Sequence, residues 1–378
     1  MPADDRFKRD LYRPIEGAYV NTAAESPLLT PVAEALLAYA REKGLGEPGR
    51  SAFEAAAEGA RRRAAALLRA DPSGIAFAYS ASDALGLLIH SLPWEPGDRA
   101  VVSAIEYPSD LLVWRSLAGA RVAVDLVTEG PFDWGTEAIL RRIGPRTRLV
   151  VASAVSYSTG RRIDLKRIKD AVNAQGGWLL ADATQALGAV PLFADEADMI
   201  VASGFKWMMG VHGVALLYCD PQLANQFEPP FAGWRSVAGS GRDARRAPLK
   251  EGALRFEMGM PGFPALFALE AGLAYLQDRV GLEETWRRVE HLAGHLRSAL
   301  AQMGLPVITR EDPAERAGIV CLHDPRARQV VAALKEAGVY AYAPVDDVIR
   351  FSPHFFNCDE DIDRCIFAMR HVIRSRSE

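Results

Sequence analysis

The chain has 378 residues, of which 49% are hydrophobic, and a formal net charge of −4. This length exceeds one ordinary core, so we expect a large and a small domain. The small negative net charge does not favour binding to nucleic acid. Because we find neither an apolar run long enough to span a membrane nor a secretory signal, we expect a cytoplasmic protein.

The N-terminal part is expected to be helical after a short extended entry. Residues 1–18 are polar and should pack on the outside or on the small domain. Residues 19–24 are expected to be extended. Residues 31–41 and 52–69 carry apolar side chains at helical spacing with alanines between them, which predicts two helices.

Apolar runs and helical stretches then alternate up to residue 218. The expected strands are 75–79, 100–103, 122–126, 149–154, 178–181, 199–202 and 214–218. The helical stretches that separate most of them are 84–91, 111–117, 136–143 and 165–174. This alternation is typical of an α/β fold with a doubly wound, mostly parallel sheet, here of seven strands. The short spacing of the last two runs predicts a hairpin, and hence one antiparallel strand.

The pattern changes after residue 221. Residues 235–250 form a long basic loop, which we interpret as a mobile surface loop or, at 239–241, as a phosphate contact. The elements expected beyond it are helices at 264–280 and 282–303, then a β-α-β-α pattern at 319–322, 326–337, 348–351 and 359–374. The predicted divisions are an N-terminal segment 1–18, a large domain 19–250 and a small α+β domain 251–378.

Lys206 stands out because it lies in a glycine-bearing turn between two apolar runs, with Phe205 and Trp207 on either side. An apolar neighbourhood disfavours the ammonium form, lowers the pKa and makes the amine a nucleophile that can form a Schiff base. The alternative is a surface lysine whose aromatic neighbours point inward.

Asp182 comes directly after the run 178–181, at the end of a buried strand, where open α/β sheets bind ligands. A Schiff-base lysine and a buried carboxylate together fit pyridoxal phosphate chemistry. The carboxylate keeps the pyridinium nitrogen protonated, so that the ring acts as an electron sink. Alone, Asp182 would be interpreted as a helix N-cap.

Two runs, 181–188 (ADATQALG) and 203–210 (SGFKWMMG), resemble the class V aminotransferase and cysteine desulfurase superfamily, a fold-type I pyridoxal phosphate family. Further similar runs occur in family order over nearly the whole chain: 19–24 (YVNTAA), 106–110 (EYPSD), 156–160 (SYSTG), 255–261 (RFEMGMP) and 349–354 (IRFSPH). The resemblance implies the fold-type I architecture, pyridoxal 5'-phosphate as cofactor and a homodimer with shared active sites.

Residues 79–84 (YSASDA) follow the first strand of the large domain and open a helix, whose backbone N–H groups can bind an anion. The resemblance places the cofactor phosphate here, with Ala81, Ser82 and Ser203 as contacts. The alternative is an ordinary Ser/Asp N-cap. No G-x-G-x-x-G motif occurs here, which counts against a nicotinamide-binding domain.

The resemblance also assigns residues around the cofactor ring. Tyr107 would stack on the pyridine, and Ser156 and Gln185 would contact the side of the ring that carries its hydroxyl. Tyrosine is a poor base near neutral pH because its unperturbed pKa is about 10. The alternative for Tyr107 is a loop aromatic that covers the end of the sheet.

Arg350 matches the family arginine that binds a substrate α-carboxylate, and its fork geometry suits that role. The alternative is a salt bridge to Asp346 or Asp347. Arg235 and Asn21 are further candidates on the substrate side.

Three departures from the family pattern matter. Phe205 and Met260 stand where relatives bind the phosphate, and neither side chain can donate, so the way the phosphate is held stays open. Residues 339–344 contain no cysteine where desulfurases often carry their sulfur acceptor, which disfavours a persulfide-forming desulfurase. The four cysteines lack CxxC spacing, and His291 and His295 have no evident third ligand, so no metal site is predicted.

We therefore expect a pyridoxal phosphate enzyme that acts on an amino acid or amine through Lys206, by transamination or related chemistry at the α-carbon proton. The alternatives are a lyase of the desulfurase or kynureninase kind, an epimerase, or a catalytically silent relative that binds a ligand or partner.

Overall fold

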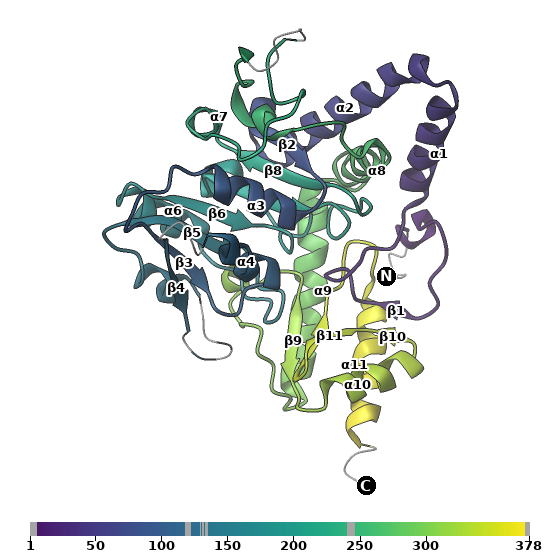
Figure 1. The fold of residues 1–378 in the computed structure, drawn as a ribbon. Helices are drawn as coiled ribbons and strands as arrows, with labels where there is room; N and C mark the ends of the chain where they lie inside the picture. The colour runs from purple at the N-terminus through teal and green to yellow at the C-terminus, as the bar shows by residue number, and fades with distance from the viewer. Residues whose placement is uncertain are drawn as a thin grey trace.

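The computed structural model describes residues 6–117, 122–128, 130, 132, 135–239 and 246–374. A seven-stranded sheet forms its centre, with the strand order β2-β8-β7-β6-β5-β3-β4 (Figure 1). The strands are β2 (Ile75–Ala78), β3 (Arg99–Ser103), β4 (Ala123–Val127), β5 (Thr147–Ser153), β6 (Trp178–Asp182), β7 (Met199–Ser203) and β8 (Ala215–Cys219). Only β8 runs antiparallel to its neighbours, β2 and β7, among these strands. The predicted α/β class, the mostly parallel sheet and the hairpin are confirmed.

The sheet is buried on both faces, which explains why its strands read as continuous apolar runs. Val150 packs into one apolar cluster, and its neighbour Val151 packs into the other, because successive side chains point to opposite faces. Helix α6 (Leu165–Asn173) covers the first face, and α3 (Ala81–Ser91) covers the second. The shorter helices beside the sheet are α4 (Pro108–Leu112), α5 (Thr136–Leu140) and α7 (Pro221–Ala224).

Two N-terminal helices project to one side of the sheet in Figure 1, α1 (Thr30–Gly44) and α2 (Arg50–Leu68). Helix α8 (Phe263–Ala274) packs against both of them. The predicted helix 264–280 is therefore shorter than expected, since α8 ends at Ala274 and a π-helical turn, Tyr275–Val280, follows. The 3₁₀ turns are Lys8–Asp10, Glu47–Gly49, Pro72–Gly74, Val113–Ser116, Ala194–Glu196, Gly252–Phe256 and Pro313–Glu315.

A second layer forms the lower part of Figure 1 and carries the C-terminal strands. Its elements are α9 (Leu282–Gln302), β9 (Val320–His323), α10 (Ala327–Glu336), β10 (Val339–Tyr340), β11 (Tyr342–Val345), β12 (Val348–Phe351) and α11 (Asp359–Arg374). β11, β12 and β9 form an antiparallel sheet in that order, and β1 (Ala18–Tyr19) pairs in parallel with β10. The sequence pattern missed β10 and β11, and it predicted an extended segment from residue 19 without a strand pairing for β1.

The N-terminal segment contacts this second layer. The Lys8 Nζ atom lies 2.6 Å from Asp361 Oδ1, and the Phe7 ring is buried 5.6 Å from that of Phe355. The segment 1–18, the large domain 19–250 and the small domain 251–378 remain predicted divisions of the chain.

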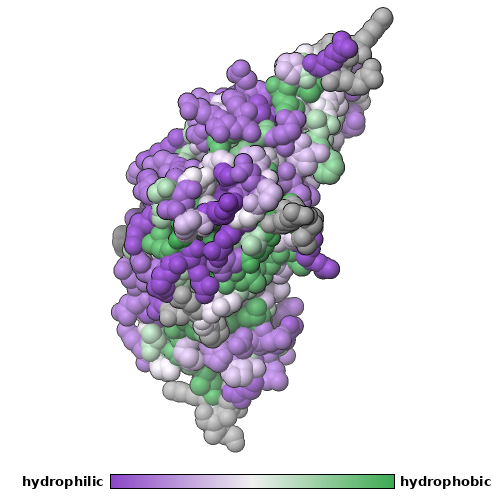
Figure 2. All heavy atoms as spheres, turned by 60° about the vertical axis from the view of Figure 1, so that its left-hand side comes forward, coloured by the Kyte–Doolittle hydropathy of each residue, from purple (hydrophilic) through white to green (hydrophobic). Residues whose placement is uncertain are grey.

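The surface shown in Figure 2 is mostly hydrophilic, with hydrophobic side chains gathered in patches between polar ones. Among the helices of the described ranges, none is both long and apolar enough to cross a membrane.

A buried histidine joins the second layer to the turn after Lys206. His354 is 0% exposed, its Nε2 lies 3.0 Å from the Trp207 carbonyl, and its ring packs edge-on against Trp207. Burial lowers the pKa of His354 to about 3, although the Trp207 carbonyl opposes the shift. The ring is therefore neutral, with the proton on Nε2 donated to that carbonyl.

This histidine predicts how stability depends on pH. Between its folded pKa of about 3 and the unfolded value of 6.5, the unfolded chain binds a proton that the folded chain does not, so stability falls as pH drops through this window. From about pH 7.5 to about pH 5, we expect this one group to cost about 2 kcal/mol of unfolding free energy. Urea unfolding of His354→Gln should lack that loss.

The control is His371→Gln, which removes an exposed histidine of α11 and should retain the full pH dependence of the unaltered chain. An equal loss in both variants would contradict the assignment.

Candidate active site

A cavity of about 160 Å³ opens where three central strands end. Ser153 ends β5, Asp182 ends β6 and Ser203 ends β7, and all three line this cavity together with the start of α3. The carboxyl ends of parallel strands form the usual ligand edge of an open α/β sheet. The predicted cofactor residues that meet here are Ala81, Ser82, Tyr107, Asp182, Gln185, Ser203 and Lys206.

Lys206 enters the cavity from the tight turn after β7. The Gly204 carbonyl accepts the Gly210 N–H at 2.9 Å, which closes the turn. Gly188, with φ +95°, lies so close to this turn that a Cβ atom there would be 2.2 Å from the Trp207 carbonyl oxygen. The Lys206 Nζ atom lies 5.6 Å from the ring centre of Tyr107 and 5.5 Å from that of Phe205. The predicted aromatic surroundings are thus present.

The charge state of Lys206 follows from these surroundings. Burial lowers the pKa of its amine to about 8, and the nearby Arg350 also lowers it, whereas Asp182 and Glu25 act in the opposite direction. At pH 7 about a tenth of the amine is therefore unprotonated and nucleophilic, far more than for a lysine of ordinary pKa.

Asp182 is buried, and its Oδ1 accepts the Thr184 N–H at 2.8 Å. Burial raises the pKa of this carboxyl, while the Thr184 hydrogen bond and the charge of Lys206 oppose the shift. Gln185, on the same wall, is held at both ends of its amide: Nε2 donates to the Ala23 carbonyl and Oε1 accepts from the Trp207 ring.

Two further carboxyl groups lie beneath this site, and sequence reasoning did not assign them. Glu106 accepts hydrogen bonds from the Ser153 backbone, at 2.9 Å, and from the Ser153 hydroxyl. Burial raises the pKa of Glu106 to about 7, and the charge of Asp182 adds to this. In the sequence, Glu106 stands out only as the first residue of the run 106–110 (EYPSD).

The second of these groups is Asp110, which is 0% exposed. Neither of its carboxyl oxygens has a hydrogen-bond partner in the described part of the chain. Burial, with the charges of Asp182 and Glu106, raises the pKa of Asp110 well above its usual range. Its surroundings therefore favour the protonated form of the carboxyl. In the sequence, Asp110 resembles an ordinary acidic residue in the first turn of a helix, where it interacts favourably with the helix dipole and is usually exposed to solvent. The sequence pattern therefore does not indicate that this side chain is buried.

The start of α3 forms the other end of the cavity. Ser80 is the N-cap: its hydroxyl accepts the Asp83 N–H at 3.1 Å and donates to Asp83 Oδ2 at 2.7 Å. Ser82 is therefore free of the capping role, and its hydroxyl lies 2.6 Å from that of Ser109. Helix α3 has eleven residues, so its unpaired N–H groups present a positive dipole end to the cavity.

Arg350 lies on β12 and is only 3% exposed. Its Nη1 donates to the Tyr157 carbonyl at 3.0 Å, and its Nε has no partner in the described ranges. The alternative salt bridge does not form, because Asp346 pairs with Arg328 at 2.6 Å and Asp347 with His323 at 3.2 Å. A buried guanidinium with a free donor is suited to an anionic ligand.

Arg350 and three other predicted residues lie outside the lining of this cavity. The Asn21 Oδ1 atom is buried and unpartnered among the described residues. The Ser156 hydroxyl accepts the Ser158 and Thr159 N–H groups at 3.3 and 3.2 Å. Arg235 pairs with Glu54 at 2.7 and 3.1 Å and approaches Glu257 at 3.9 Å. Their roles at the site stay predictions.

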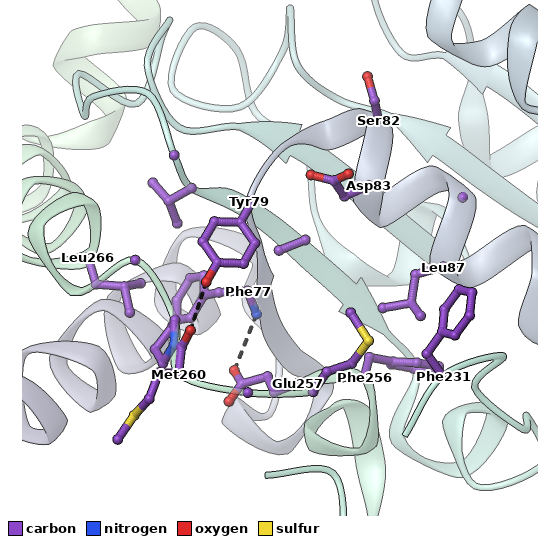
Figure 3. A pocket seen from close by; sticks show the side chains of 18 of the residues that line it. Phe77, Tyr79, Ser82, Asp83, Leu87, Phe231, Phe256, Glu257, Met260 and Leu266 are labelled. Atoms are coloured by element: carbon purple, nitrogen blue, oxygen red, sulfur yellow. Dashed lines mark hydrogen bonds between the residues drawn. The ribbon is translucent and has the colours of Figure 1, made fainter. Parts of the chain in front are cut away.

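A larger and more apolar cavity, of about 540 Å³, lies on the other side of Ser82, which lines both cavities (Figure 3). The Tyr79 hydroxyl crosses it to the Met260 carbonyl at 2.8 Å, and Glu257 accepts the Phe77 N–H at 3.3 Å. The smaller cavity, by contrast, is the one lined by the Lys206 amine and the buried Asp182 carboxyl.

Two remaining sequence features lie elsewhere. His291 and His295 both contact Asp359, at 2.8 and 3.4 Å, yet no group of metal-ligating side chains within the described ranges is placed to hold an ion. The phosphate contact considered at 239–241 includes residues 240 and 241, which lie outside the described residues, as does the rest of the basic loop up to 245.

Comparison with known proteins supplies the family. The family model described as aminotransferase class-V matches residues 18–365. An uncharacterized aminotransferase, YcbU, of Bacillus subtilis is 30% identical over 84% of this chain and 82% of its own length. A kynureninase of Deinococcus radiodurans is 31% identical over 68% of this chain and 63% of its own length.

The fold has close structural counterparts as well. The apo cysteine desulfurase of Thermococcus onnurineus superposes with a TM-score of 0.88 at 23% identity, covering 99% of both chains. The family resemblance and the fold-type I architecture predicted from the sequence are thus confirmed, and the chain belongs to the class-V aminotransferase family.

Proposed function

We propose that this protein is a pyridoxal phosphate enzyme that acts on an amino acid by chemistry at the α-carbon proton, with transamination as the leading reaction. The observation that carries the proposal is the meeting of Lys206 and Asp182 in one small cavity, where burial lowers the pKa of the lysine amine to about 8. An intact pair of this kind also opposes the alternative of a catalytically silent relative.

Pyridoxal phosphate is the cofactor of this family, which confirms the predicted cofactor. The residues present fit it: a nucleophilic amine, a buried carboxyl, an aromatic ring at Tyr107 and a helix N-terminus for the phosphate. When bound through its aldehyde to a lysine, the cofactor supplies an electron sink for charge that develops at the substrate.

The residues have distinct proposed roles. The Asp182 carboxyl would hold the proton of the ring nitrogen, and Tyr107 would stack on the ring. Ala81, Ser82 and Ser203 would contact the phosphate, whereas Gln185 and Ser156 would lie on the side of the ring hydroxyl. Lys206 would hold the cofactor and then move the proton at the substrate α-carbon, which its lowered pKa permits near neutral pH.

Arg350 would bind the substrate α-carboxylate. Its burial, its unpartnered Nε and the engagement of Asp346 and Asp347 elsewhere support this role. Asn21, whose buried side-chain oxygen is also unpartnered, would accept a hydrogen bond from the substrate. Arg235 would reach a substrate only by leaving Glu54.

The placement of the cysteines helps to decide between transamination and sulfur transfer to a protein thiol. All four lie in the described ranges and are buried, and burial raises the pKa of Cys321, the one opposite Arg350 on β9, to about 12. No thiol of this chain is therefore placed to accept sulfur, which counts against a persulfide-forming desulfurase. Cleavage without a protein thiol is the second candidate, since a kynureninase and a cysteine desulfurase are among the similar proteins.

A homodimer stays part of the proposal. The large apolar cavity has exposed hydrophobic residues around it, with Tyr79 59%, Phe231 68%, Met258 42% and Met260 40% exposed. A second copy would cover this apolar surface. Because Ser82 lines both cavities, the second copy would also lie next to the cofactor cavity and help to close it. Sedimentation equilibrium of the purified chain would show whether it is a monomer.

The pH dependence of cofactor attachment tests the lysine. Only the unprotonated amine attacks an aldehyde, so the rate at which the visible band of the lysine-bound cofactor develops should rise with pH, with an inflection at about pH 8 and a plateau above it. In Asp182→Asn the inflection should move to lower pH, because Asp182 raises the pKa of Lys206. An inflection near the value of free lysine, about 10.4, would contradict this.

Product analysis with a panel of amino acids tests the reaction. A transaminase should release a stoichiometric amount of oxo acid and continue only when a second oxo acid is added. A lyase should turn over steadily without an acceptor, and an epimerase should change only the configuration of the substrate. Lys206→Ala should abolish every one of these activities, and a variant that retained them would refute the assignment of Lys206.

A comparison of an amino acid with its decarboxylated amine tests Arg350. Loss of a charge-assisted hydrogen bond costs about 1.5–3 kcal/mol, so Arg350→Gln should lower kcat/KM for the amino acid by roughly tenfold to a hundredfold. The amine should be affected far less. Arg370→Gln, which removes an exposed arginine of α11, is the matched control and should behave like the unaltered enzyme.

A further inference from the structure

We propose that the hydroxyl of Ser109 is a contact of the cofactor phosphate, acting as a pair with Ser82 across the start of α3. This inference rests on the proposed function and adds a residue that neither the family resemblance nor the sequence pattern assigned. It answers how the phosphate is held in a chain that carries Phe205 and Met260.

Neither of those two side chains can supply the missing contact. The Phe205 ring stacks on His212, with ring centres 4.0 Å apart and an interplanar angle of 23°. Met260 lies on the wall of the large apolar cavity and is absent from the lining of the cofactor cavity. Neither side chain carries an N–H or O–H group. The donors for a phosphate must therefore come from other residues around the cavity.

Most other polar side chains of this cavity are already engaged. The Ser80 hydroxyl caps α3 and binds Asp83, and the Ser153 hydroxyl binds Glu106. The Thr184 hydroxyl accepts the Ser203 N–H, and both ends of the Gln185 amide are occupied. The remaining serines are Ser203 at the end of β7, and Ser82 and Ser109.

Ser82 and Ser109 form a distinctive pair. Their oxygens lie 2.6 Å apart, and within the described ranges each hydroxyl bonds only to the other. Ser109 belongs to α4 and Ser82 to α3, and both residues line the cofactor cavity. The hydrogen bond between them therefore joins these two helices at the cavity wall. The oxygens of an ionised phosphate accept hydrogen bonds and do not donate them. If the hydrogen bond between Ser82 and Ser109 broke when the phosphate bound, both hydroxyls could donate to phosphate oxygens.

The charges around the pair are compatible with an anion. The dipole of α3 favours negative charge at Ser82, which lies in its first turn and lines the cavity. The nearest acid of α3 is Asp83, whose carboxylate is held by the Ser80 hydroxyl at 2.7 Å and lines the other, apolar cavity.

The test compares two ligands that differ only in the phosphate. Equilibrium dialysis of the full chain would give the dissociation constants of pyridoxal phosphate and of pyridoxal. Ser109→Ala should weaken pyridoxal phosphate binding by roughly tenfold to a hundredfold, the effect of losing a hydrogen bond to a charged group, and leave pyridoxal binding unchanged. Ser109→Thr, which keeps the hydroxyl, should restore most of the affinity.

The control is Ser51→Ala, which removes an exposed hydroxyl of α2 that donates to the Pro48 carbonyl at 3.5 Å. It should leave the affinity for both ligands unchanged. Equal unfolding midpoints in urea would show that Ser109→Ala folds normally.

The outcomes are distinct. Unchanged pyridoxal phosphate affinity in Ser109→Ala would overturn this inference and leave the proposed function intact. Equal weakening of both ligands would also overturn it, because Ser109 would then act through the ring or the local packing. Failure of the unaltered chain to bind pyridoxal phosphate would overturn the proposed function and this inference together.

Discussion

The burial of opposite charges at the ends of β6 and β7 is the constraint on which the site depends. Taking Lys206 out of water disfavours its ammonium form, and taking Asp182 out of water disfavours its carboxylate. Each group partly restores the charged form of the other. The amine is left nucleophilic near neutral pH without being an isolated buried charge, which a protein of ordinary stability tolerates poorly.

The fold places these groups by simple means. Parallel strands that are buried on both faces end at one edge, so side chains far apart in sequence meet there without long loops. Beneath them, Asp110 and Glu106 add two carboxyl groups that burial keeps largely or partly protonated. The site therefore keeps its net charge low although it gathers three acids.

The central sheet could be predicted from the sequence because its strands are continuous apolar runs separated by helical patterns. β1 and β10 could not, since each has two residues and is defined only by pairing across more than three hundred positions. Lys206 and Asp182 were recognisable by residue type and by their place after buried strands. The pairing of Ser109 with Ser82 and the burial of Asp110 depend on how the turn before α4 folds onto α3, which linear spacing does not reveal.

His354 has a mechanical consequence. It lies four positions after Arg350 on the same segment, and its hydrogen bond ends on Trp207, the residue next to Lys206. The segment that carries the group proposed to bind the substrate carboxylate is thus joined, by one hydrogen bond and one edge-on ring contact, to the turn that carries the group proposed to attack the cofactor. A displacement of this C-terminal segment would therefore strain the turn that holds Lys206, so the two halves of the proposed site are coupled through a residue that touches neither the cofactor cavity nor the solvent.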